Sequence, residues 1–272
     1  MKKLALAFIA LISASAMSAQ TTPADRDTTT IDFGKTQVII LSTPTNDSLS
    51  SDSVNITPPD FKSELTHWAG LDLGVNFLLN SDNKTTLAQN DEWLELDQAR
   101  SLSWRINFYE EKIRIIKDYV GITTGLGLSW NSYTFNNNVN LNVTSDSTFG
   151  VIDSLPEYSK NKLRATYLHL PVMLEFNTSR NPDKSFHLAA GVVGGWKIGS
   201  IHKQEFELDG QNYKVRVKDD FNLSPLTLDL TARVGYKNFT VWATYGLTPL
   251  FKDNKGPEVF PVSLGITLIP FG

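Results

Sequence analysis

Apolar and polar positions alternate with a period of two along most of the chain beyond residue 66. The last stretch, residues 259–271, shows this pattern most clearly. One parity holds apolar side chains and the other holds small ones: Phe260, Val262, Leu264, Ile266 and Leu268 against Ser263, Gly265 and Thr267. This period is typical of a β-strand with one apolar face. Because an unpaired strand at a chain end is an open edge, we expect it to pair with the first strand and close a barrel.

Seven further stretches alternate in the same way. They cover residues 68–78, 102–109, 119–135, 166–176, 186–200, 226–236 and 239–247. The predicted fold class is all-β, an eight-stranded antiparallel up-and-down transmembrane β-barrel, with the even strand number of bacterial outer-membrane barrels. Long connections (79–101, 136–165, 201–225) alternate with short ones (110–118, 177–185, 237–238), and 248–258 is intermediate. Since the long loops of such barrels are extracellular, we expect both termini to be periplasmic.

The choice of the lipid-facing parity depends on the small residues and on the aromatic ones. A soluble barrel with an apolar interior would expose a surface of Gly, Ser, Thr and Ala with few charges, which solvates poorly. On the apolar parity, aromatic residues gather at both strand ends, as in the girdles of membrane barrels. The loop-proximal girdle is Phe77, Trp104, Trp130, Trp196, Tyr245 and Phe260, and the turn-proximal girdle is Phe108, Phe176, Phe186, Tyr236 and Phe239. We therefore expect the apolar parity to face lipid.

The first 66 residues differ in composition from the barrel. Residues 1–19 read as a secretory signal, with Lys2 and Lys3 before an apolar run that is too short to span a membrane. Cleavage after Ala16 and cleavage after Ala19 both fit, and we favour Ala19. Residues 20–66 are rich in Thr, Ser, Asp and Pro, which predicts a mostly disordered periplasmic segment. Within it, residues 36–41 (TQVIIL) suggest a short strand that pairs with a partner or with the barrel rim, and residues 67–272 form the barrel.

Charge and cysteine content exclude several classes. The net charge of −4 gives no basic footprint for nucleic acid. The absence of cysteine excludes disulfides, thiolate chemistry and an amino-terminal lipid anchor on cysteine. No later stretch approaches about 18 uninterrupted apolar residues, so membrane insertion must be as a barrel. We expect an exported, monomeric protein integral to the cell outer membrane, with no cofactor and no metal.

Several stretches resemble one known family. They include 67–76 (HWAGLDLGVN), 121–133 (GITTGLGLSWNSY), 191–199 (GVVGGWKIG), 219–226 (DDFNLSPL) and 245–271, with further similarity at 29–41, 167–176 and 230–236. This pattern resembles the outer-membrane β-barrel family abundant in Bacteroidota. The resemblance implies a small barrel in a Gram-negative outer membrane, whose partners are outer-membrane lipid, lipopolysaccharide and the assembly machinery. Phe271 is the expected assembly signal, although Gly272 follows it where such proteins usually end in an aromatic residue.

Six ionisable residues share the inferred lumen parity: Asp72, Arg105, Glu175, Lys197, Asp229 and Arg233. Their charges sum to zero, and an eight-stranded lumen is only wide enough for side chains. We therefore expect them to form a network of paired charges that occludes the lumen, because an isolated buried charge is costly. For Lys197 and Arg233 the nearest candidate acids along neighbouring strands are Glu175 and Asp229. A proton or ion path is the alternative.

No catalytic constellation stands out. His169 and Glu175 invite a lipase-like hypothesis, but they share the lumen parity six residues apart, so we do not expect contact. The long loops hold acidic residues such as Asp91, Glu92 and Asp220, either as solvated surface or for cation bridging to lipopolysaccharide or adhesion. The favoured function is a non-enzymatic barrel with an occluded lumen and a structural or surface-interaction role. The alternatives are a lipid-modifying barrel enzyme and a narrow solute channel.

Overall fold

The computed structural model describes residues 28–33, 36–41, 67–181 and 184–270. The predicted signal, its cleavage site, Phe271 and most of residues 20–66 lie outside these ranges. The chain divides into two compact units, Met1–Lys62 and Ser63–Gly272. In the first unit, β1 (Thr28–Phe33) and β2 (Thr36–Leu41) form an antiparallel hairpin. The strand at residues 36–41 therefore pairs with a neighbouring segment of its own chain.

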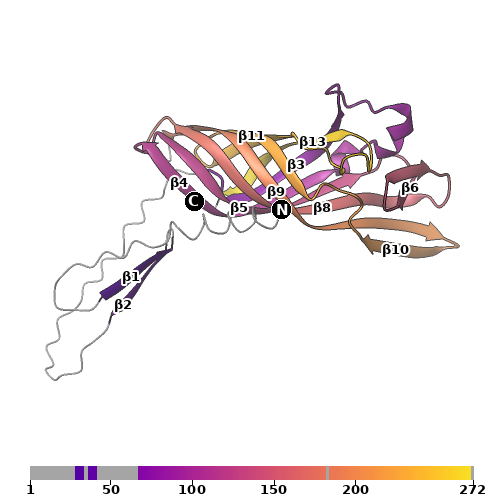
Figure 1. Cartoon of the computed structure of the whole chain (residues 1–272), viewed down its shortest axis with the longest axis horizontal. Coiled ribbons are helices and arrows are strands. Elements are labelled where there is room, and N and C mark those ends of the chain that lie inside the picture. The colour runs from indigo at the N-terminus through magenta and orange to yellow at the C-terminus, as the bar shows by residue number, and fades with distance from the viewer. Residues whose placement is uncertain (1–27, 34–35, 42–66, 182–183, 271–272) are drawn as a thin grey trace, which may run out of the picture. The chain divides into compact units, whose positions relative to one another are not determined.

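The second unit is a closed ring of eight antiparallel strands (Figure 1). In ring order these are β3 (Gly70–Asn80), β4 (Leu102–Ile116), β5 (Val120–Thr134), β8 (Tyr158–Asn177), β9 (Phe186–Leu208), β11 (Leu226–Tyr236), β12 (Phe239–Gly246) and β13 (Val259–Pro270). The last strand pairs with the first along its whole length, from Val259 opposite Asn80 to Pro270 opposite Gly70. The predicted eight-stranded ring and its closure are confirmed.

The two faces of the ring differ in side-chain type. On β11 and β13, the outward Leu230 and Leu264 are 46% and 48% exposed, whereas the inward Thr231 and Ser263 are 6% and 4% exposed. A narrow lumen accommodates small residues, and the apolar ones lie outside, where lipid replaces water as the neighbour. This arrangement excludes a soluble barrel with an apolar interior.

The loops contain more strand than the sequence patterns predicted. β4 continues to Ile116, β8 begins at Tyr158 and β9 continues to Leu208. Within the expected loops lie β10 (Gln211–Lys218), which pairs with β9, and a hairpin of β6 (Val139–Val143) and β7 (Thr148–Ile152). Figure 1 shows the β9–β10 ribbon running beyond the barrel at the same end as β6. Pairing satisfies backbone groups there, although the polar composition favoured loops.

The two ends of the barrel differ in the length of their connections. The long-loop end carries residues 81–101, 135–157, 201–225 and 247–258, together with β6, β7, β10 and two short 3-10 helices, η1 (Gln89–Leu94) and η2 (Gln98–Arg100). The short-turn end carries residues 117–119, 178–185 and 237–238, and the chain enters the barrel there. Among the described residues, no helix has the length and apolarity needed to cross a membrane.

Candidate functional site

The middle of the lumen is built around a buried ion pair. Arg233 donates from Nη1 and Nη2 to the two carboxylate oxygens of Asp72, over 2.9 and 3.1 Å. Asn107 Nδ2 and the Thr267 hydroxyl also donate to Asp72, at 2.9 and 2.7 Å. The pair thus draws its partners from β3, β4, β11 and β13. Because both charges are paired and hydrogen-bonded, their burial is sustainable.

Arg105 and Trp242 fill the lumen beside this pair. The Arg105 guanidinium lies 4.1 Å from the Trp242 ring centroid and donates to the Thr244 hydroxyl at 3.0 Å. Trp242 is 1% exposed, and its ring lies against Gly74, where an added Cβ would come within 2.6 Å of it. A residue without a side chain is therefore needed opposite this indole.

A second polar cluster surrounds Glu175 toward the short-turn end. Its carboxylate accepts from Thr123 at 2.6 Å, lies 3.2 Å from Lys112 Nζ and lies 3.1 Å from His67 Nδ1. Lys112 was not expected in the lumen. A bulge between Asn107 and Tyr109 shifts the phase of β4, so that Phe108 and Tyr109 both point outward and Lys112 points inward. The sequence signal is the renewed alternation after two adjacent aromatic residues.

The segment that leads into β3 places a large side chain inside the barrel. Trp68 is fully buried and packs with Met173, Ala189 and Val193. Its backbone N–H and that of Ala69 donate to the Glu110 carboxylate at 3.0 and 2.7 Å. Like Lys112, Glu110 lies beyond the β4 bulge and was not predicted. This contact fixes an indole inside the barrel rather than at its rim.

The long-loop end contains an apolar core in which loops and strand ends meet. Fifteen buried residues form it: Leu78, Leu87, Trp93, Leu94, Tyr133, Phe135, Val139, Leu163, Ala165, Tyr167, Phe221, Leu223, Leu250, Phe251 and Val259. Leu94, Val139 and Leu223 come from three different loops, and all are fully buried. Residues from loops and from strand ends thus share one core, and we call it the loop core.

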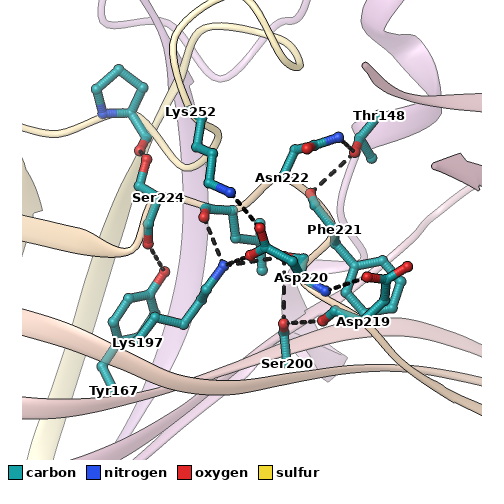
Figure 2. A network of polar contacts seen from close by, with 12 residues as sticks. Thr148, Tyr167, Lys197, Ser200, Asp219, Asp220, Phe221, Asn222, Ser224 and Lys252 are labelled. Carbon is teal, nitrogen blue, oxygen red and sulfur yellow. Dashed lines mark hydrogen bonds and ion pairs between the residues drawn. The ribbon is translucent and has the colours of Figure 1, made fainter. Parts of the chain in front are cut away.

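A polar network anchors the loop at residues 219–225 over this core (Figure 2). The Asp220 carboxylate binds both Lys197 and Lys252, and Lys197 Nζ also donates to the Leu223 carbonyl at 2.7 Å. Asn222 Nδ2 donates to the Thr148 hydroxyl at 3.0 Å. Burial would raise the pKa of Asp220, but the two lysines outweigh it and hold that pKa below its ordinary value. The network joins β7, β9 and the β12–β13 loop.

The structure distributes the six predicted lumen charges over several partners. Asp72 and Arg233 pair with each other, whereas Glu175 pairs with Lys112, and Lys197 turns to the loop acid Asp220 instead of to Glu175 or Asp229. Arg105 lies over Trp242. For the Asp229 side chain, no hydrogen bond or ion pair exists among the described residues, although its backbone belongs to the β11 ladder. Proximity along neighbouring strands was therefore a poor guide to the partners of Lys197 and Arg233.

Among the described residues, the histidines join neither a cluster of metal ligands nor a Ser-His-acid triad. His169 lies 3.2 Å from Ser129 Oγ and not against Glu175. His67 stacks on His187 with a centroid distance of 3.5 Å, and His202 Nε2 lies 2.8 Å from Asn161 Oδ1. In the part of the chain that the structure describes, no group of three or more metal-binding side chains gathers.

The predicted girdle residues lie on the outward face. All eleven are half-buried or exposed; Trp196 and Phe186, at opposite ends of the barrel part of β9, are 60% and 59% exposed. Phe108 differs from its expected position at a strand end, because β4 continues eight residues further, with Ile113 and Ile115 exposed beyond it. Phe186 and Trp196 bracket the stretch of β9 that we expect to cross the membrane, and we call this stretch the spanning part of β9.

A closed, eight-stranded antiparallel ring with an apolar exterior and a polar interior is the architecture of an outer-membrane β-barrel. The model of the outer membrane protein beta-barrel domain family matches residues 68–252. Since this match covers more than half of the chain, the protein belongs to that family and is integral to the outer membrane.

The chain was also compared with curated proteins and with solved structures. No curated protein matches the sequence. Among solved structures, the crystal structure of Ail, the attachment invasion locus protein of Yersinia pestis, is similar with 11% identity and a TM-score of 0.29, covering 73% of this chain and 95% of that chain. The crystal structure of Ail in complex with the heparin analogue sucrose octasulfate gives 12% identity, a TM-score of 0.29, and coverage of 72% and 92%.

Proposed function

We propose that this protein is a monomeric, non-enzymatic outer-membrane barrel with a sealed lumen and a structural or surface-interaction role. The observation that carries the proposal is the burial of large side chains at both ends of the lumen and between them. Trp68 occupies the short-turn end, and the loop core lies at the long-loop end. Between them, Trp242 and Arg105 fill the bore. A sealed barrel presents an exterior and a loop surface as its interaction sites.

The proposal includes an orientation. The long-loop end is extracellular, and both termini are periplasmic. An even strand number and the alternation of long loops with short turns support this orientation. We also propose that the protein belongs to the group of such barrels found in Bacteroidota, because of the sequence stretches that resemble that group. Outer-membrane lipid and lipopolysaccharide are then the immediate neighbours of the barrel.

The enzyme alternative has little support from its best candidate pair. Ser129 and His169 are 0% and 3% exposed inside the barrel, so a lipid substrate has no path to them. His169 Nδ1 has no hydrogen-bond partner among the described groups, so no acid orients the imidazole as in a hydrolase triad. We therefore assign this pair to lumen packing.

Planar-bilayer recording tests the sealed lumen. Purified protein, shown by its heat-dependent gel shift to be folded, is expected to give no steady current. Sustained, ion-selective conductance from the wild type would overturn the proposal and favour the solute channel. The same preparation after boiling serves as the unfolded control.

Single-cysteine labelling tests the orientation, because the natural chain has no cysteine. Asp253→Cys lies at the long-loop end and Lys184→Cys at the short-turn end, and both positions are exposed. A membrane-impermeant maleimide added to whole cells is expected to label Asp253→Cys and to label Lys184→Cys only after lysis. The opposite labelling pattern would show that the barrel has the reverse orientation in the membrane.

A further inference from the structure

The ribbon formed by the outer parts of β8, β9 and β10 has one strongly basic face. Cross-strand register places Lys162 opposite Lys203 and Lys203 opposite Arg216. The same parity of the three strands carries Lys160, Lys162, Arg164, Lys203, Lys214, Arg216 and Lys218, with the acids Glu205 and Glu207. Seven cations against two carboxylates contrast with a chain whose net charge is −4. We call this surface the basic face.

The basic face points outward and follows directly on the lipid-facing band. On β8, Leu163 and Ala165 point inward and are fully buried, so Lys162 and Arg164 point to the outside. Trp130 of the loop-proximal girdle pairs with Thr166, one alternation before Arg164 on the same side. With a rise of about 3.3 Å per residue and a tilt of about 40°, Arg164 and Lys162 lie ~5 and ~10 Å beyond the girdle. This depth is that of the lipid headgroups.

The cations of this face are crowded and mostly lack acidic partners. Lys160 pairs with Glu205 at 2.8 Å, and Arg164 Nε donates to the Ser132 hydroxyl at 3.2 Å. Among the described residues, no ion pair involves Lys162, Lys203 or Arg216. Burial, and after it the charges of Arg164, Arg216 and Lys160, lower the pKa of Lys203. An anion placed between these side chains would relieve their repulsion.

We infer that the basic face binds the phosphate groups of lipopolysaccharide in the leaflet at the long-loop end. The inference rests on the proposed orientation, because lipopolysaccharide occupies the outer leaflet. Its motive is the coincidence of charge and depth: Lys162, Lys203 and Arg216 form a row across three strands at the level where lipid phosphates lie. Basic clusters at this depth are known to bind anionic lipids, and each cation contributes appreciably to the affinity.

The test compares two charge-matched triple variants in zwitterionic detergent micelles titrated with lipopolysaccharide and followed by thermophoresis. The basic-face variant is Lys162→Gln, Lys203→Gln, Arg216→Gln. The off-face variant is Lys84→Gln, Lys184→Gln, Lys237→Gln, at exposed positions elsewhere. At about fivefold per cation, the basic-face variant is expected to bind on the order of 100-fold more weakly. The off-face variant is expected to bind like the wild type.

Two further titrations use only the wild-type protein, so they do not depend on the folding of any variant. Dephosphorylated lipopolysaccharide is expected to bind on the order of 100-fold more weakly than the intact lipid, by the same reasoning. Soluble polyphosphate is expected to bind far more weakly than lipopolysaccharide. Equal binding of the dephosphorylated lipid, of polyphosphate or of the folded basic-face variant would overturn the inference. Since these titrations use purified protein, they fail independently of the maleimide test of orientation.

Discussion

Asp72 and Arg233, which are 161 positions apart in the chain, form a bidentate ion pair inside the barrel. The acid lies on β3 and the base on β11, with β12 and β13 between them in the ring. Their side chains are 0% and 1% exposed. The pair therefore reaches across the lumen and joins the first strand of the barrel to β11. Removal of one partner leaves the other charge buried and unpaired.

Asp72→Ala is expected to cost about 3–5 kcal/mol of unfolding free energy, because it leaves Arg233 unpaired. Asp229→Ala is the matched control, since Asp229 shares the lumen side but its side chain has no hydrogen bond or ion pair among the described residues. Its loss is expected to cost much less. Urea titration of the barrel in lipid vesicles, read by the heat-dependent gel shift, gives both values. Equal costs would contradict the special role of the Asp72–Arg233 pair.

A charge on the outward face is expected to oppose insertion. Leu230 lies near the middle of β11, points outward and is 46% exposed. Leu230→Arg places a cation in the apolar band and is expected to cost about 2–4 kcal/mol. Leu230→Met keeps the apolar character and is expected to cost under about 1.5 kcal/mol. Folding yields and urea midpoints in vesicles compare the two, and equal tolerance would mean that this face does not meet lipid.

The strands and their faces could be predicted from the sequence. In β11 and β13, for example, apolar residues alternate with small or polar ones, so the apolar residues must share one face. The bulge in β4 could not be placed in this way. It depends on how two strands stagger around the ring, and it changes which of Glu110, Glu111 and Lys112 point inward. The adjacent pair Phe108 and Tyr109 was the available signal.

The pairing of charges was also beyond the sequence. Arg233 reaches across the lumen to Asp72, and Lys197 reaches toward the long-loop end to the carboxylate of Asp220. Both choices depend on the cross-section of the lumen and on loop conformation, which sequence separation does not encode. The strand β10 was different, because Tyr213, Val215 and Val217 alternate with basic residues and did carry a strand pattern.

A single methyl group at Gly74 is expected to disturb the lumen. A Cβ there would lie 2.6 Å from Trp242 Cη2 and 2.5 Å from the Leu264 carbonyl oxygen. Overpacking of this kind costs about 1–3 kcal/mol, and the expected result for Gly74→Ala lies in that range. Gly199→Ala is the control, since nothing lies within 4 Å of its added Cβ. Similar urea midpoints for the two variants would show that Trp242 yields freely.

Acid is expected to loosen the loop core through His202. This residue lies beyond the spanning part of β9, is 5% exposed and packs against Phe135 and Phe221, each with a centroid distance of 6.2 Å. Burial lowers its pKa to about 4. Because the unfolded value is about 6.5, the neutral imidazole contributes stability above that pH, and the contribution is lost as the pH falls from about 6.5 to about 4. Asp220 keeps its charge through this window, because its pKa is held below the ordinary carboxyl value.

Limited proteolysis of vesicle-embedded protein measures this effect, since the loops are cleaved when their core opens. An acid-active protease is expected to cut the long-loop end faster at about pH 4.5 than at about pH 6.5, after correction for its own activity on an unfolded substrate. His202→Gln retains an amide donor for Asn161 Oδ1 but does not titrate, so its corrected rate is expected to stay flat over the same range. If the wild type were equally flat, or if His202→Gln kept the acid response, the neutral His202 would not be what holds the loop core closed.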